Sequence, residues 1–191
     1  MVARCTSWQA RTFLVTTALL LVAVACGGES GGGGEVHALG DTVTVGYNDR
    51  TDTGARGDDT TLEITVLAVR EGSHDELTDA GFEVDAEDQN TTPYYIDARY
   101  ENTGDVSIER NVGVSLEDAD GNLIGSTLVF DYGDKGFPPC ESVDEGEFAP
   151  GDSYESCTLF LVPEGVEPGS VSFLSDQGAD EEPEFVYWEV D

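Results

Sequence analysis

Four cysteines carry the most reactive side chains of this 191-residue chain, and they fall into two pairs. Cys5 and Cys26 lie near the N-terminus, whereas Cys140 and Cys157 lie in the C-terminal part. Two cysteines that remain together in an exported domain predict a disulfide. The alternative is a pair of metal thiolates, but structural zinc needs four ligands at close spacing, and no histidine lies near these cysteines. We therefore predict a bridge between Cys140 and Cys157.

The chain has two histidines, His37 and His74. Ser73, His74 and Asp75 are neighbours in the sequence, whereas the members of a catalytic triad converge from separate elements. A blue-copper site needs two histidines, a cysteine and usually an axial methionine, but methionine occurs only at Met1. We expect both histidines to lie in exposed loops. The chain is predicted to be non-enzymatic and to need no cofactor.

Asp118, Asp120 and Asn122 alternate as the oxygen ligands of a calcium ion would. A calcium-binding EF-hand loop needs glycine at its sixth position and glutamate at its twelfth. Counted from Asp118, glycine is fourth and the twelfth residue is Val129. These residues are therefore expected to form a hairpin turn, and a calcium-binding surface domain is kept as an alternative.

The sequence around Cys26 predicts where the protein is located. Arg4 and Arg11 precede an apolar run over residues 13–25, which ends in small residues directly before Cys26. A basic start, a short apolar run and a small-residue cut site predict a signal peptide over residues 1–25. A cysteine after the cut looks like a bacterial lipoprotein signal, with palmitate or similar acyl chains on Cys26. A plain secretory signal would not need this cysteine, and a membrane-spanning helix would need about 20 apolar residues.

Residues 26–35 are predicted to form the lipidated cysteine and a flexible linker, because GGESGGGGE over 27–35 is too rich in glycine to hold one conformation. Residues 36–191 are long enough for one domain with its own core. The chain has 40 acidic and 8 basic residues, with a formal net charge of −32. Such a surface repels nucleic acid and anionic lipid headgroups, so acyl chains on Cys26 must hold the domain at the membrane.

Short alternating segments separated by turns predict an antiparallel β-sandwich of about seven to nine strands. The expected strands are 41–47, 60–70, 92–100, 106–108, 112–116, 123–132, 154–162, 171–174 and 185–190. Leu67 and Val69 break the alternation of the second segment, which indicates a bulge or a strand end buried on both faces. Segment 71–92 is expected to be mostly loop, with one helical turn capped by Ser73 and Glu76.

Several of these motifs together resemble a known family. They are GDTVTV at 40–45, TTLEITVLAV at 60–69, YYIDARYENTGD at 94–105, LEDADGN at 116–122 and APGDSYESCTLFLV at 149–162. The chain resembles the immunoglobulin-like extracellular domains of unknown function found in bacterial lipoproteins, which share their fold type with a secreted immunoprotective antigen of mycobacteria. The resemblance covers roughly 40–190 and implies an immunoglobulin-like sandwich outside the cytoplasm. It supplies no catalytic residues.

The sequence thus predicts a lipoprotein on the extracytoplasmic face of the cell membrane, anchored through Cys26. Its expected role is to bind an unknown protein or small ligand, and nucleic acid is excluded as a partner. Loops 71–91 and 133–147 are the expected contact surfaces, because sandwiches present function on loops. A structural or accessory subunit of a cell-envelope complex is the alternative role.

Overall fold

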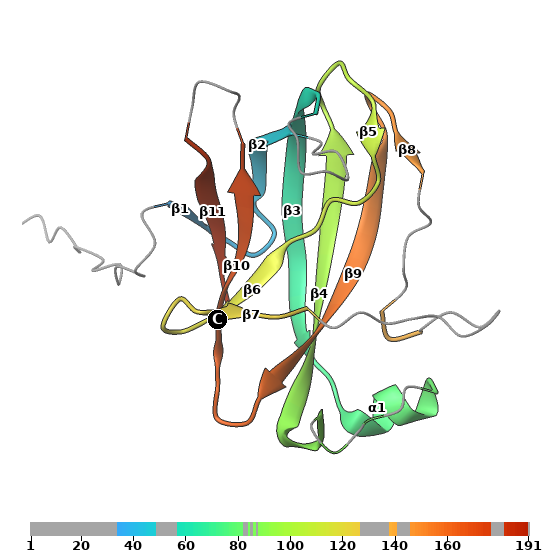
Figure 1. The fold of residues 1–191 in the computed structure, drawn as a ribbon, viewed down its shortest axis with the longest axis vertical. Helices are drawn as coiled ribbons and strands as arrows, with labels where there is room; N and C mark the ends of the chain where they lie inside the picture. Colours follow the sequence, from blue (N-terminus) through green and yellow to red (C-terminus); the bar gives the residue numbers. More distant parts are fainter. Residues whose placement is uncertain are drawn as a thin grey trace, which may run out of the picture.

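The computed structural model describes residues 34–48, 57–81, 84, 86, 88–126, 138–140, 146–176 and 182–190. These residues form two β-sheets that face each other across a hydrophobic core (Figure 1). The predicted signal peptide, Cys26 and nearly all of the predicted linker lie outside the described residues.

One sheet has five strands and is called here the five-stranded sheet. In spatial order it contains β1 (Glu35–Ala38), β11 (Glu184–Glu189), β10 (Pro168–Ser175), β6 (Ser115–Asp118) and β7 (Leu123–Ile124). Its neighbouring strands are antiparallel except for β1 and β11, which pair in parallel. The first and last strands of the described chain therefore lie side by side (Figure 1).

The second sheet, the four-stranded sheet, is antiparallel throughout. It contains β2 (Thr42–Asn48), β3 (Asp59–Glu71), β4 (Thr91–Asn102) and β9 (Ser153–Pro163). The register between β3 and β4 shifts between Val66 and Ala68, so Leu67 is the extra residue of a bulge. This is one of the two explanations that the broken alternation predicted.

Two short strands, β5 (Ile108–Glu109) and β8 (Glu147–Phe148), pair beside the sandwich. The 3-10 turn η1 (Asp88–Asn90) precedes β4. Helix α1 (His74–Asp79) is capped by Ser73, whose side chain accepts a hydrogen bond from the Glu76 amide while the Glu76 carboxylate accepts one from the Ser73 amide. The predicted capping box is therefore present. Across the described ranges, no helix has the length and apolar character of a membrane span.

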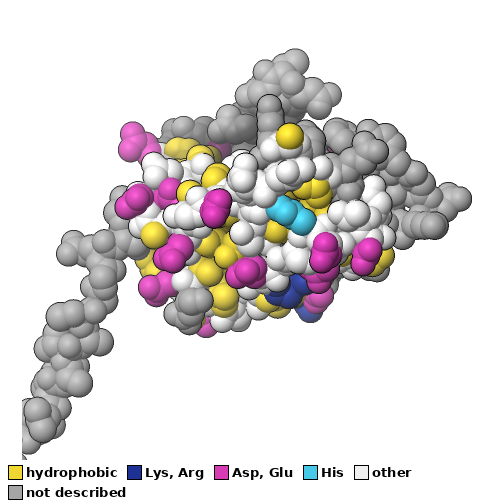
Figure 2. All heavy atoms as spheres, turned by 90° about the horizontal axis from the view of Figure 1, so that it is seen from below, with side chains coloured by type: hydrophobic (Ala, Val, Ile, Leu, Met, Phe, Trp, Pro, Cys, Tyr) yellow, Lys and Arg dark blue, Asp and Glu magenta, His cyan; other side chains and the backbone are white. Residues whose placement is uncertain are grey.

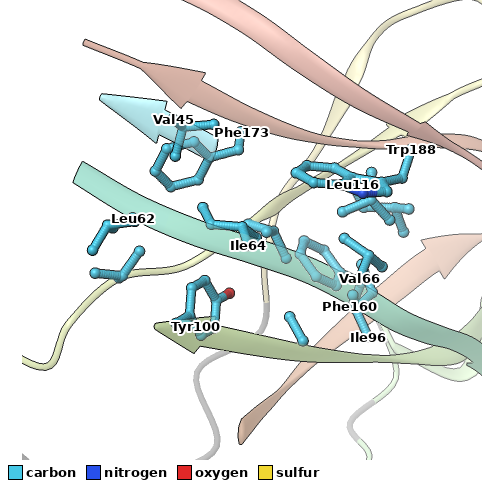
Figure 3. Close-up of a cluster of buried hydrophobic side chains, with 14 of the residues drawn as sticks. Val45, Leu62, Ile64, Val66, Ile96, Tyr100, Leu116, Phe160, Phe173 and Trp188 are labelled. Carbon is cyan, nitrogen blue, oxygen red and sulfur yellow. The ribbon is translucent and has the colours of Figure 1, made fainter. Parts of the chain in front are cut away.

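The core is built from alternate side chains of both sheets, as strand geometry requires. In β3 these are Leu62, Ile64 and Val66, which are fully buried opposite Trp188 and Phe173 of the five-stranded sheet (Figure 3). The indole nitrogen of Trp188 donates to the backbone oxygen of Asp41 at 3.0 Å, so its one polar group is satisfied. The predicted all-β sandwich is confirmed.

Three predicted strands differ from the structure. Of segment 106–108 only Ile108 is in a strand, as the first residue of β5. Segment 112–116 becomes a strand only from Ser115 onward, although Val112 and Val114 are buried. In the described part of segment 123–132, strand β7 ends at Ile124. The physical reason is that β7 pairs with β6 of the five-stranded sheet, whereas Ser126 bridges to Phe160 of the four-stranded sheet. The chain changes sheets at Gly125 and cannot continue as one strand.

Candidate functional site

Cys140 and Cys157 form a disulfide, with Cα atoms 5.1 Å apart. Cys157 lies on the outer face of β9, opposite Asp97 of β4. Cys140 packs there in a small second cluster with Leu77 of α1, Tyr95 and Leu159. The bridge therefore fastens segment 138–140 and, through shared packing, α1 to the outside of the four-stranded sheet. Leu77 is fully buried, so the acidic segment 71–91 covers more apolar surface than its sequence suggests.

Arg70 strengthens the same region. Its guanidinium donates to Asp97 at 2.6 and 3.1 Å and to the backbone oxygen of Pro139 at 3.2 Å, and it stacks over Tyr95 with 5.2 Å to the ring centroid. The hydrogen bond to Asp97 is the main cause that raises the pKa of Arg70. These contacts tie segment 138–140 to β3 and β4. The second predicted contact loop, 133–147, lies largely outside the described residues.

Asp118, Asp120 and Asn122 form the turn between β6 and β7. One carboxylate oxygen of Asp118 accepts the amides of Asp120 and Asn122 at 2.9 and 2.8 Å, and the Asn122 side chain donates to both carboxylate oxygens. The bond from the Asn122 side chain is the largest cause that lowers the pKa of Asp118. Gly121 completes the turn with φ of 81°, which a side chain would disfavour. These bonds account for the three residue types as turn residues.

The prediction that both histidines lie in exposed loops is wrong. His37 lies on strand β1, where pairing with Trp188 turns its mostly buried ring toward the core. His74 is the first residue of α1, and its Nε2 lies 3.5 Å from Thr91 Oγ1. Among the residues that the structure describes, no three histidine, cysteine, aspartate or glutamate side chains gather as metal ligands.

The feature that sequence reasoning missed is the outer face of the five-stranded sheet. Of the five large hydrophobic side chains exposed in the described residues, four lie on this face. They are Val36, Leu123, Leu174 and Phe185, each between 41% and 66% exposed. The pairing register places Phe185 opposite Leu174 and Val36 opposite Tyr187. The ring centroids of Tyr187 and Phe185 are 6.0 Å apart. We call this set, with Tyr187, the apolar face.

Two glutamates lie on the same face of the five-stranded sheet, next to the apolar side chains. Register places Ser170 between Glu189 of β11 and Glu117 of β6, and Leu123 lies beyond Glu117. These glutamates, with Tyr187 and Val36, line a hollow of about 290 Å³ that the Asp118–Gly121 turn borders. Glu117 is only 8% exposed, and its carboxylate forms no hydrogen bond or ion pair with a described residue. Burial, followed by the charge of Glu117, raises the pKa of Tyr187.

Charge is distributed unevenly over the molecule. The three arginines that the structure describes, Arg70, Arg99 and Arg110, all lie outside the five-stranded sheet. Figure 2 shows the lower end of the molecule, where hydrophobic side chains gather between acidic ones and basic side chains appear only at one edge. Carboxylates on the apolar face therefore have no cation of their own sheet to neutralise them.

No protein-family model matches the chain, and no curated protein matches it. Among solved structures, it is similar to the secreted protein MPT63 of Mycobacterium tuberculosis, with 14% identity, a TM-score of 0.50, and coverage of 82% of this chain and 98% of that chain. It is also similar to YcdA of Bacillus subtilis strain 168, with 16% identity, a TM-score of 0.46, and coverage of 68% and 36%. At such identities the likeness shows the fold alone. The expected immunoglobulin-like sandwich is thereby confirmed.

Proposed function

We propose that this protein is a non-enzymatic binding module, held at the extracytoplasmic face of the cell membrane by acyl chains on Cys26. The observation that carries the binding role is the apolar face, because hydrophobic side chains that gather on one exposed surface often mark a contact site. The proposed contact surface is thus a sheet face rather than the loops that the sequence favoured.

Anchoring is supported by the sequence before Cys26 and by the disulfide. A Cys140–Cys157 bridge is stable in an exported protein and rare in the cytosol. The secreted MPT63 has the same fold, which is in keeping with export. The net charge of −32 would oppose adsorption to anionic lipids, so membrane attachment depends on the lipid.

Fractionation of cells that make the Cys26→Ser variant tests the anchor. We expect the parent protein in the membrane fraction, labelled by a palmitate analogue, and the variant unlabelled and released. Cys5→Ser, which changes a cysteine of the predicted signal peptide, is the matched control and should stay anchored. Membrane retention of unlabelled Cys26→Ser would refute the proposal.

Photo-crosslinking in intact cells tests the binding role. A photoreactive residue at Leu174 or Phe185 should yield a defined adduct, whereas the same residue at exposed Leu67, on the bulge of β3, should not. The alternative role, an accessory subunit of an envelope complex, predicts a stoichiometric membrane partner at those positions. Equal adducts from all three positions would argue against a specific surface.

A further inference from the structure

The apolar face carries one carboxylate, that of Glu117, with which no described residue forms a hydrogen bond or an ion pair. Glu117 is 8% exposed and lines the hollow, and no hydrogen bond or ion pair joins its carboxylate to a described residue. Charged residues that are exposed to so small an extent are normally paired. Ser172 adds a second case, since its hydroxyl is fully buried on the same face and has no hydrogen-bond partner.

The hollow has the composition of a cation site. Glu117 of β6 and Glu189 of β11 supply negative charge from two strands. Along β11, Tyr187 lies on the same face between Glu189 and Phe185. A lysine or arginine side chain suits such a site, because carboxylates pair with the charge and an aromatic face attracts it. None of the described basic residues of this chain lies on the five-stranded sheet to fill it.

The spacing between apolar and acidic side chains on this face indicates the conformation of the partner. Along β11, Phe185 and Glu189 are four residues apart on one face, which corresponds to about 13 Å. An extended segment with the same period places an apolar side chain over Phe185 and Leu174 while a basic side chain four residues away reaches Glu117. A second copy of this chain fits poorly, because it would bring the same carboxylates against each other.

We propose that the apolar face binds an extended, basic and apolar segment of a partner protein, with a lysine or arginine side chain inserted between Glu117, Glu189 and Tyr187. The inference rests on the proposed function, since it names the class of partner for that module. It is tested on the purified full chain, so a negative result here leaves membrane attachment, measured by fractionation, as a separate question.

The probe is a short peptide with a leucine and a lysine four residues apart, so that both side chains lie on the same face of the extended chain. Binding is measured by calorimetry at physiological salt, which screens the general charge of the protein. Glu117→Gln should weaken binding roughly tenfold or more, because it removes the carboxylate that pairs with the inserted lysine. The control Glu155→Gln, the same charge change at an exposed position of β9, should weaken it about twofold at most. Phe185→Ser should weaken binding, whereas Leu67→Ser should not.

Two further comparisons decide between occupants. Acetylating the peptide lysines removes their charge and keeps their length, so binding should fall as it does with Glu117→Gln. The melting temperature of Glu117→Gln should equal or exceed that of the parent, because the variant loses no hydrogen bond or ion pair to a described residue. This separates lost binding from lost folding. Equal effects of Glu117→Gln and Glu155→Gln, undiminished binding of acetylated peptide, or a dimer that Phe185→Ser dissociates would each overturn the inference.

Discussion

Thr60 and Asn102 are joined by a hydrogen bond of 3.0 Å between the Thr60 hydroxyl and the Asn102 side-chain oxygen, in the interior between β3 and β4. The Asn102 amide group also donates to the backbone oxygens of Val106 and Phe148 at 2.9 and 2.8 Å. Gly104 donates to the Asn102 side-chain oxygen at 3.2 Å, and a side chain at Gly104 would collide with Thr60. Asn102 thus fastens the end of β4 to its turn and to β8.

We predict that Asn102→Ala lowers the free energy of unfolding by about 3 kcal/mol or more, because several buried polar groups lose their partner at once. Urea denaturation measures the change. The control is Asn122→Ala, since Asn122 is an exposed asparagine of a turn and its loss should cost about 1 kcal/mol or less. Similar losses in both variants would show that the buried network contributes little.

The disulfide gives a second prediction. Replacing Cys140 and Cys157 together by alanine should lower the free energy of unfolding by about 3 kcal/mol, since the bridge closes a loop with a sequence separation of 17. Urea denaturation with and without reductant provides the internal control: the parent should lose a comparable amount when reduced, and the double variant should not respond. A parent that is insensitive to reductant while its thiols are shown to be free would contradict this.

The β6–β7 turn should make stability depend on acid pH. The pKa of Asp118 is lowered in the folded state, chiefly by the Asn122 side chain, so the folded state binds its proton less readily than the unfolded state. The stabilisation is present above the unfolded pKa of about 4 and is lost as pH falls through the folded pKa. As the pH is lowered from about 5 to about 2, the melting temperature should therefore fall less steeply for Asp118→Asn than for the parent. Parallel curves would contradict the prediction.

Calcium binding can be tested at the same turn. If Asp118 acts only through the hydrogen bonds of its turn, adding calcium should leave the melting temperature of the parent unchanged. A calcium-dependent rise that Asp118→Ala combined with Asp120→Ala abolishes would instead support the calcium-binding alternative.

Tyr154 should produce the opposite dependence at alkaline pH. Burial is the main cause that raises its pKa to about 12, although its hydroxyl donates to the Val112 backbone oxygen at 3.4 Å. A raised folded pKa means that stability is full below the unfolded pKa of about 10 and is lost as pH rises toward 12. Tyr154→Phe keeps the ring contacts with Tyr100 and Phe148, so its alkaline decline should be shallower. Tyrosinate absorbance and thermal melts check both points.

Local patterns predicted the parts of the fold that depend on neighbours in sequence. The alternation of β3 and β4, the bulge at Leu67 and the capping box of Ser73 and Glu76 each arise from residues a few positions apart. The parallel pairing of β1 with β11 was not predicted, because it joins segments from opposite ends of the described chain and needs no local motif.

The apolar face was missed for a related reason. Its side chains come from four strands, and only the register of the five-stranded sheet brings them together. One signal was present in β11, where Phe185 and Tyr187 alternate with Val186 and Trp188, so both faces of the strand are apolar. Such a strand indicates a sheet that is covered on both sides. Glu117 gave no signal, because the hollow that it lines is formed by residues from several strands and a turn.

The parallel pairing of β1 and β11 also determines how the domain responds to mechanical force. A pull on the chain ahead of Glu35 acts along β1, so its pairing with β11 from Glu35–Val186 to Ala38–Glu189 is loaded in shear. Bonds loaded together must break together, whereas an antiparallel hairpin pulled from its open end would unzip one pair at a time. Under the proposed anchorage, the β1–β11 pairing would resist tension between the membrane and a bound partner. The lifetime of the folded domain under load would then follow its unfolding rate.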